Sequence, residues 1–219
     1  MGLFGRGKRE RSTPQPSAGG EEVKWIMPKG LGWTVDDLYA LEAQGEWGEA
    51  LRRWKQLLAP FNDPVIADKI QDMPAHRHTW LHIGLCARHV GDYDESLQAY
   101  AKAQELARRA HDHHFEVNAL TCIGIVHRNA GRHDQALTVL QDALAQARSV
   151  GDPSLSVNIH DNIGNCYAEQ GRLEDALTQV TAAWDIIEAN PSRVDPGLAH
   201  RVSGNLQILR EALGRSASS

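Results

Sequence analysis

Residues 160–183 read HDNIGNCYAEQGRLEDALTQVTAA, and the same pattern occurs twice earlier in the chain. The segments WLHIGLCARHVGDYDESLQAYAKA from Trp80 and LTCIGIVHRNAGRHDQALTVLQDA from Leu120 align with it without a gap. Five columns recur at intervals of 40 residues: Gly84, Gly124 and Gly164; Gly91, Gly131 and Gly171; Ser96, Ala136 and Ala176; Leu97, Leu137 and Leu177; and Ala103, Ala143 and Ala183. A fixed period of this length predicts an array of repeats.

Each column has a physical role in a helical hairpin. Apolar residues recur at three and four positions and nowhere alternate, so every repeat is expected to be helical. The Gly84 column lies in the first helix, where the second helix must pass closely. The Gly91 column follows the first helix, at the position that favours a positive φ. The small residue of the Ser96 column then packs back on the first helix. Such a hairpin cannot bury its apolar face alone, so neighbouring hairpins must stack.

The flanking sequence extends the array at both ends. Residues 33–58 hold a degenerate copy in which Leu38 replaces the packing glycine, followed by an insertion of about six residues around Asp63-Pro64. Asp152-Pro153 and Asp195-Pro196 are further helix-start signals. We therefore expect a disordered head over residues 1–22 and a degenerate first repeat with its insertion over 23–74. The regular repeats should follow over 75–190, then a capping helix over 191–213 and a disordered tail over 214–219.

The repeats resemble the tetratricopeptide repeat family over about residues 33–213, most clearly in Ile163, Gly164, Tyr167, Gly171 and Ala176. The 40-residue period is similar to that of a longer-helix subgroup found in bacterial regulators and Pins-type polarity adaptors. The resemblance implies an all-α fold, a right-handed superhelical solenoid of antiparallel helix pairs ending in a capping helix. It implies protein binding and not catalysis.

Composition excludes several function classes. The basic opening carries a charge of +3, so residues 21–219 carry −8, and an acidic body does not favour nucleic-acid binding. No run of apolar residues is long enough to span a membrane, and the start MGLFGRGKRERS lacks a secretory signal. Phe4 and the basic residues near it are too few for stable membrane anchoring. The three cysteines show no CxxC spacing, and the expected location is the cytoplasm.

The chemistry-bearing residues form no catalytic motif, so we expect neither an enzyme nor a cofactor. Eleven histidines are the unusual feature. His111, His113 and His114 are expected in a loop between repeats, where a solvated loop is favoured over a metal site. His78 and His82, one helical turn apart, lack a third ligand. Cys86 and Cys166 share a column and are expected to be small core residues, whereas Cys122 falls at the groove or its edge.

The resemblance also implies a groove lined by the first helices. Its partner-contacting columns carry His78, His82, Arg88, His89, Asn118, Thr121, Arg128, Asn129, Asn158, Asn162, Asn165, Arg201 and Asn205. A carboxamide both donates and accepts, so these asparagines suit the backbone of an extended peptide. They equally suit hydrogen bonds to neighbouring helices, and the sequence leaves both readings open. Arg88, Arg128 and Arg201 favour a partner with acidic groups.

The leading hypothesis is an adaptor or scaffold that binds a protein or peptide segment in this groove. The alternatives are a sensor of peptides or small ligands and a chaperone-like cofactor for a secreted or assembled partner. Partner identity and oligomeric state do not follow from the sequence.

Overall fold

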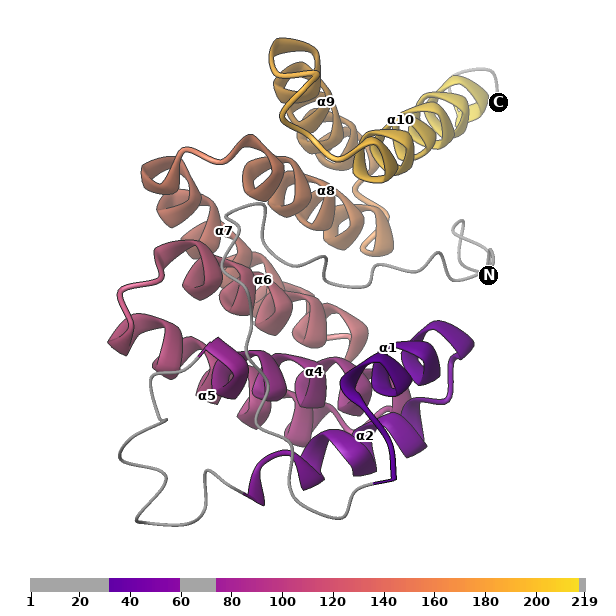
Figure 1. Cartoon of the computed structure of the whole chain (residues 1–219). Helices are drawn as coiled ribbons and strands as arrows, with labels where there is room; N and C mark the ends of the chain where they lie inside the picture. Colours follow the sequence, from indigo (N-terminus) through magenta and orange to yellow (C-terminus); the bar gives the residue numbers. More distant parts are fainter. Residues whose placement is uncertain (1–31, 60–73, 217–219) are drawn as a thin grey trace. The chain divides into compact units, whose positions relative to one another are not determined.

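The computed structural model describes residues 32–59 and 74–216, and every regular element in these ranges is an α-helix. The helices are α1 Val35–Gln44, α2 Trp47–Gln56, α4 Pro74–Val90, α5 Tyr93–Arg109, α6 His113–Asn129, α7 His133–Val150, α8 Pro153–Glu169, α9 Leu173–Ala189 and α10 Pro196–Ser216 (Figure 1). The predicted all-α class is confirmed. None of these helices combines the length and apolar character needed to cross a membrane.

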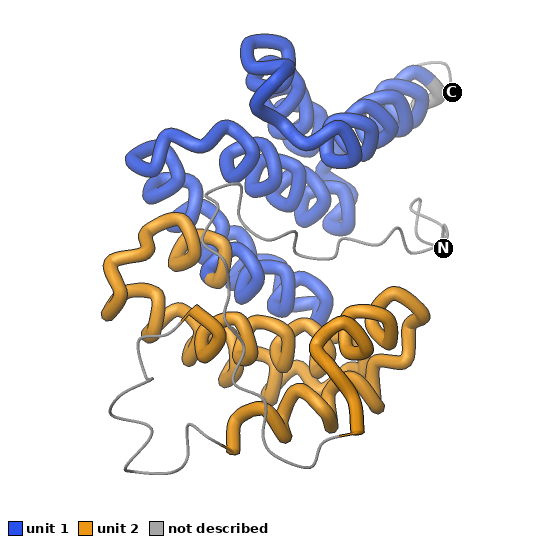
Figure 2. Tube along the Cα trace, in the orientation of Figure 1, with its two compact units in different colours: residues 1–7, 120–219 blue, residues 8–119 orange. Residues whose placement is uncertain are grey.

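The chain divides into two compact units (Figure 2). The described part of unit 2 ends at residue 119 and that of unit 1 begins at residue 120, so the division falls within α6. In unit 2, α1 packs on α2, α2 on α4, and α4 on α5. In unit 1, α7 packs on α8, α8 on α9, and α9 on α10. Each unit therefore contains paired helices of the kind that the repeats predict.

The helix starts follow from capping side chains. Asp92 accepts a hydrogen bond from the Glu95 amide at 3.0 Å before α5. Asp152 accepts one from the Ser154 amide at 2.8 Å, with Pro153 as the first residue of α8. Asp195 accepts one from the Leu198 amide at 2.9 Å at the start of α10. The two Asp-Pro start signals within the described residues are thus confirmed.

The turn column behaves as predicted. Gly91, Gly131 and Gly171 have φ of 90°, 74° and 78°, and Gly45 of the degenerate copy has 82°. These values lie in the left-handed region, where a side chain is strained. The hairpin turns therefore depend on glycine.

The packing column is also confirmed. A Cβ added to Gly84 would lie 2.8 Å from Tyr100, one on Gly124 2.6 Å from Leu140, and one on Gly164 2.7 Å from Val180. The small residue of each second helix, Ser96, Ala136 or Ala176, is fully buried. The Ser96 hydroxyl also donates to the Gly84 carbonyl at 2.7 Å, which ties α5 to α4.

Each unit has its own apolar core. The unit 2 core centres on Leu38, Trp54, Leu57 and Ile83, with Trp47 and Trp80 partly buried at its edge. The unit 1 core gathers Val180, Ile187, Val202, Leu206 and Leu209 from α9 and α10. Leu38, which replaces a packing glycine, is completely buried.

Three predicted segments differ from the structure or lie beyond it. His113 and His114 form the first turn of α6, and only His111 and Asp112 remain in the turn, so the expected inter-repeat loop is shorter than predicted. The Asp112 carboxylate accepts from the Phe115 amide at 2.9 Å, which allows the helix to begin this early. The head 1–22 and the insertion around Asp63 lie outside the described residues.

The final helix spans Pro196–Ser216, whereas the sequence predicted it over 191–213. Its Gly204 continues the packing column, but a Cβ there would meet nothing within 4 Å among the described residues. The described part of the chain thus holds no second helix over this glycine.

Candidate functional site

The predicted groove residues of unit 2 lie mainly on α4, and His82 is the most buried of them. The His82 and Glu42 side chains are only 3% and 0% exposed, and His82 Nδ1 lies 2.9 Å from Glu42 Oε1. The same oxygen accepts from Trp54 Nε1 at 2.7 Å and from Cys86 Sγ at 3.5 Å. The Trp54 indole stacks on the His82 ring at 4.4 Å. His82 therefore joins α4 to α1 and α2.

Sequence reasoning missed Glu42. Glu42 precedes Arg88 by 46 residues, the interval between the turn glycines Gly45 and Gly91, and so occupies the Arg88 column. A carboxylate in the column that carries Arg88 and Arg128, with Ala168 in the last copy, was the available signal. Its second oxygen, Oε2, is buried and has no hydrogen-bond partner among the described residues.

The other α4 residues contact aromatic rings or each other. The His78 ring meets the Phe115 ring edge-on at 4.9 Å, and burial lowers the pKa of His78 to about 4. The His89 ring stacks on Trp47 at 3.8 Å, and Arg88 Nη2 lies 3.3 Å from His89 Nε2. The predicted histidine pair at 78 and 82 is thus engaged with protein groups. Within the described residues no group of three metal-ligating side chains is suitably placed for an ion.

The groove residues of α6 differ in burial. Thr121 is buried, at 1% exposure, Asn118 is half-buried and Asn129 is exposed. Arg128 contacts another helix, since its Nη1 donates a hydrogen bond to Asn162 Oδ1 on α8 at 2.9 Å.

The groove residues of α8 and α10 form one hydrogen-bonded network in unit 1. Asp161, only 1% exposed, accepts from Arg201 Nε at 3.0 Å and from Asn205 Nδ2 at 2.8 Å. Arg201 Nη2 also donates to Asn158 Oδ1 at 2.9 Å. Asn162 donates to the Asn158 carbonyl at 2.8 Å. These contacts fasten the final helix to α8.

Asn165 differs from its neighbours. It is half-buried on α8, and its carboxamide takes part in none of the hydrogen bonds found among residues 32–59 and 74–216. Because positions 158, 162 and 165 share one side of a helix, Asn165 continues the row formed by Asn158 and Asn162. We call the side of α8 and α10 that bears Asn158, Asn162, Asn165 and Asn205 the asparagine face.

The cysteines of the repeat column are core residues. Cys86 and Cys166 are both completely buried. Burial raises the pKa of the Cys86 thiol far above its ordinary value, and it raises that of Cys166 to about 11. Both thiols therefore stay protonated and unreactive at neutral pH.

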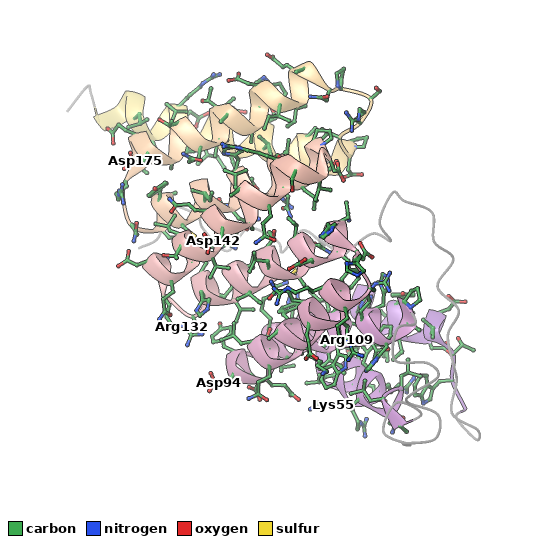
Figure 3. The ribbon with its side chains drawn as sticks, turned by 90° about the vertical axis from the view of Figure 1, so that its left-hand side faces the viewer. Lys55, Asp94, Arg109, Arg132, Asp142 and Asp175 are labelled. Carbon is green, nitrogen blue, oxygen red and sulfur yellow. The ribbon has the colours of Figure 1, made fainter. Side chains whose placement is uncertain are left out.

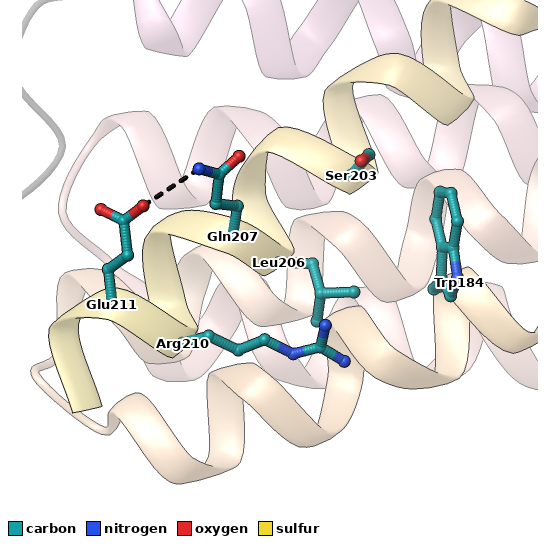
Figure 4. A pocket seen from close by; sticks show the side chains of 6 residues that line it. All are labelled: Trp184, Ser203, Leu206, Gln207, Arg210 and Glu211. Atoms are coloured by element: carbon teal, nitrogen blue, oxygen red, sulfur yellow. Dashed lines mark hydrogen bonds between the residues drawn. The ribbon is translucent and has the colours of Figure 1, made fainter. Parts of the chain in front are cut away.

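A shallow cavity between α9 and α10 was not anticipated from the sequence (Figure 4). It has a volume of about 290 Å³. Leu206 and Arg210 of α10 line it together with Trp184 of α9, and Gln207 Nε2 donates to Glu211 Oε1 at 3.0 Å along its rim.

Comparison with known proteins places the chain in a family. One family model described as tetratricopeptide repeat matches residues 77–149 and 115–189, and a second with the same description matches residues 38–111. No curated protein sequence matches the chain significantly.

Several solved structures share the fold. A Rap protein complexed with Competence and Sporulation Factor superposes with a TM-score of 0.66 at 16% identity, over 83% of this chain and 48% of that one. The apo form of RapI superposes with a TM-score of 0.64 at 13% identity, over 82% of this chain and 47% of the RapI chain. A putative kinesin light chain from Podosopora anserina superposes with a TM-score of 0.61 at 12% identity, over 84% of this chain and 86% of the kinesin light chain. This chain spans about half the length of the two Rap chains.

At these identities the structures show a common fold of helical repeats. The family models cover the regular repeats and most of the degenerate copy. The tetratricopeptide repeat is a protein–protein interaction module, and this chain belongs to the tetratricopeptide repeat family.

Proposed function

We propose that this chain is a non-enzymatic adaptor that binds a segment of a partner protein on the asparagine face of unit 1. The Asn165 carboxamide carries the proposal. It offers two N–H donors and one acceptor, and no described residue uses them. The backbone of an extended partner segment presents the matching C=O acceptors and N–H donor.

The surrounding network supports this role because it holds the face rigid. Asn158 and Asn162 are bonded to each other, to Arg128 and to Arg201. A partner then binds a face that is already ordered, and loses less free energy to the ordering of side chains. The network also means that Asn162, at 6% exposure, acts through neighbouring helices.

The charges on this face refine the expected partner. Arg201 is paired with Asp161 at 3.0 Å, so its charge is largely compensated. Arg128 Nε is 3.6 Å from Glu169 Oε1, which is outside hydrogen-bond distance. We propose that acidic groups of the partner contact Arg128 and that Arg201 serves to position Asp161 and Asn158.

The test compares partner capture from the native lysate by the wild-type chain, Asn165→Ala and Gln141→Ala, an exposed site on α7. Two lost hydrogen bonds, at about 1 kcal/mol each, should weaken the captured partner's binding about 30-fold in Asn165→Ala. Its unfolding midpoint should not fall, because no internal hydrogen bond is lost and alanine is the better helix former.

Gln141→Ala should bind like wild type. Equal affinity of Asn165→Ala and wild type would remove the asparagine face from the interaction. Stabilisation by a free short peptide, measured as a thermal shift, would instead support the alternative of a peptide sensor.

A further inference from the structure

The turn between α6 and α7 holds basic side chains with buried nitrogens that form no hydrogen bond among the described residues. Arg128 Nε, Arg132 Nε and Nη2, and His133 Nδ1 are all inaccessible to solvent and form no hydrogen bond among the described residues. A buried donor left unsatisfied costs free energy, and such groups are rare in native proteins. Four such nitrogens lie around one turn of unit 1, beside Gln170 Oε1, a buried acceptor that is also unsatisfied among the described residues.

Two of these nitrogens converge on one carboxylate. Glu169 Oε1 lies 3.6 Å from Arg128 Nε, and Glu169 Oε2 lies 3.6 Å from His133 Nδ1. Both distances exceed those of hydrogen bonds. The Glu169 side chain is 40% exposed, whereas Arg128 and His133 are 17% and 25% exposed. A partly exposed carboxylate therefore forms a long ion pair with each of these two nitrogens and a hydrogen bond with neither.

The start of α7 adds positive potential at the same place. Arg132 is its N-cap and makes no side-chain capping hydrogen bond, so the first amides of this helix lack the carboxylate that Asp92 supplies at the start of α5. An uncapped helix N-terminus attracts anions. The Asp134 carboxylate lies in the first turn of α7, where it offsets part of this potential, and it accepts from Gln170 Nε2 at 3.2 Å.

We propose that Arg128 and His133 form an oxyanion-binding site at the N-terminus of α7. An oxygen of a carboxylate or phosphate accepts from Arg128 Nε and His133 Nδ1, and Glu169 is the internal anion that it displaces. Arg128 is held for this contact by its Nη1 bond to Asn162 at 2.9 Å. The site rests on the proposed adaptor function, since it specifies the anion contact through which Arg128 meets acidic groups of a partner. Anion titration of the free chain tests it separately from partner capture.

The equivalent turn 40 residues later provides a matched control. Arg172, the counterpart of Arg132, is likewise the N-cap of α9. Its Nε donates to Asp175 at 2.7 Å, and its guanidinium lies 4.3 Å from the centre of the Tyr167 ring. This arginine is satisfied and should bind no anion. Figure 3 labels Arg132 and Asp175 at these two turns.

The experiment titrates inorganic phosphate and, separately, acetate into the full chain at constant ionic strength, which keeps general screening fixed. Binding is followed by the NMR signal of the Arg128 Nε–H, assigned with Arg128→Lys, and by the thermal midpoint. We expect the wild type to saturate, Glu169→Gln to bind about tenfold more tightly because a competing charge is gone, and His133→Gln to bind several-fold more weakly. Arg172→Lys should match wild type.

The two anions separate the sources of the ligand. Saturation by phosphate alone supports a free phosphate or phosphorylated group, and saturation by both supports a carboxylate as well. The proposal is overturned if neither anion saturates the signal, or if Glu169→Gln binds no more tightly than wild type. A loss of binding in Arg172→Lys equal to that in His133→Gln would also overturn it, since general charge would then explain the response.

Discussion

The packing glycines allow a sharp test, because one of them, Gly204, has no described residue packed against it. A methyl group at Gly164 would lie 2.7 Å from Val180 Cγ2 and 3.3 Å from the Ala176 carbonyl oxygen. Neither neighbour can yield easily, since valine has few rotamers in a helix and the carbonyl is backbone. At Gly204 the same methyl group would meet nothing within 4 Å of described structure.

Two opposing effects determine how much each glycine-to-alanine substitution changes the free energy of unfolding. Replacing glycine by alanine within a helix stabilises a protein by about 0.5–1 kcal/mol, and forcing a carbon into a packed interface costs about 1–3 kcal/mol. Gly204→Ala should therefore stabilise the chain by about 0.5–1 kcal/mol, whereas Gly164→Ala should destabilise it by about 1 kcal/mol. The difference corresponds to about 4–8 °C in unfolding temperature for a chain of this size.

The assay is thermal and urea unfolding followed by circular dichroism, with Val180→Ala alone and combined with Gly164→Ala. Removing Val180 Cγ2 should relieve the clash, so the double variant should be more stable than the sum of the single effects predicts. If Gly164→Ala were stabilised as much as Gly204→Ala, close approach of α8 and α9 could not be the reason for the glycine column.

Three further predictions concern single side chains. His111 has a φ of +56°, and the equivalent position 40 residues later is Gly151. His111→Gly should therefore raise the free energy of unfolding by about 0.5–1 kcal/mol. Its neighbour Ala110 has a helical conformation, so the control variant Ala110→Gly should lower the free energy of unfolding. Glu42→Gln should lower the unfolding midpoint by an amount equivalent to about 1–3 kcal/mol, because the buried hydrogen bond from Trp54 Nε1 then loses the carboxylate charge that strengthens it, whereas the exposed Glu46→Gln should change the midpoint little. Burial lowers the pKa of His78 from 6.5 to about 4, so its neutral ring contributes stability above pH 6.5 that is lost as pH falls towards 4. Urea unfolding of His78→Gln should show a weaker loss over this interval than wild type, and an identical pH dependence would contradict the assignment.

The repeat columns could be predicted because backbone geometry dictates them. Gly131 must adopt a positive φ, and Gly124 must admit Leu140. Both demands leave glycine at the same interval in the three regular repeats. Side-chain partners are not constrained in this way. Whether Asn162 faces a ligand or Arg128 depends on the distance between α6 and α8, which no sequence pattern encodes.

The missed residues have a similar explanation. The six-residue insertion shifts the degenerate copy, so Glu42 does not align with Arg88 at the period of 40. His133 begins a second helix, outside the columns that the family resemblance assigns to partner binding. Its relation to Glu169 becomes visible only when the turns of two successive hairpins are brought together.

Site-specific photo-crosslinking tests the central claim, that a partner segment binds the asparagine face, most directly. A photoreactive residue at position 165 on α8 is compared with one at position 141, which is exposed on the second helix α7. We expect position 165 to crosslink the captured partner through a single contiguous peptide, identified by mass spectrometry, and position 141 to give no such product. Crosslinking of the partner from position 141 and not from position 165 would contradict the account.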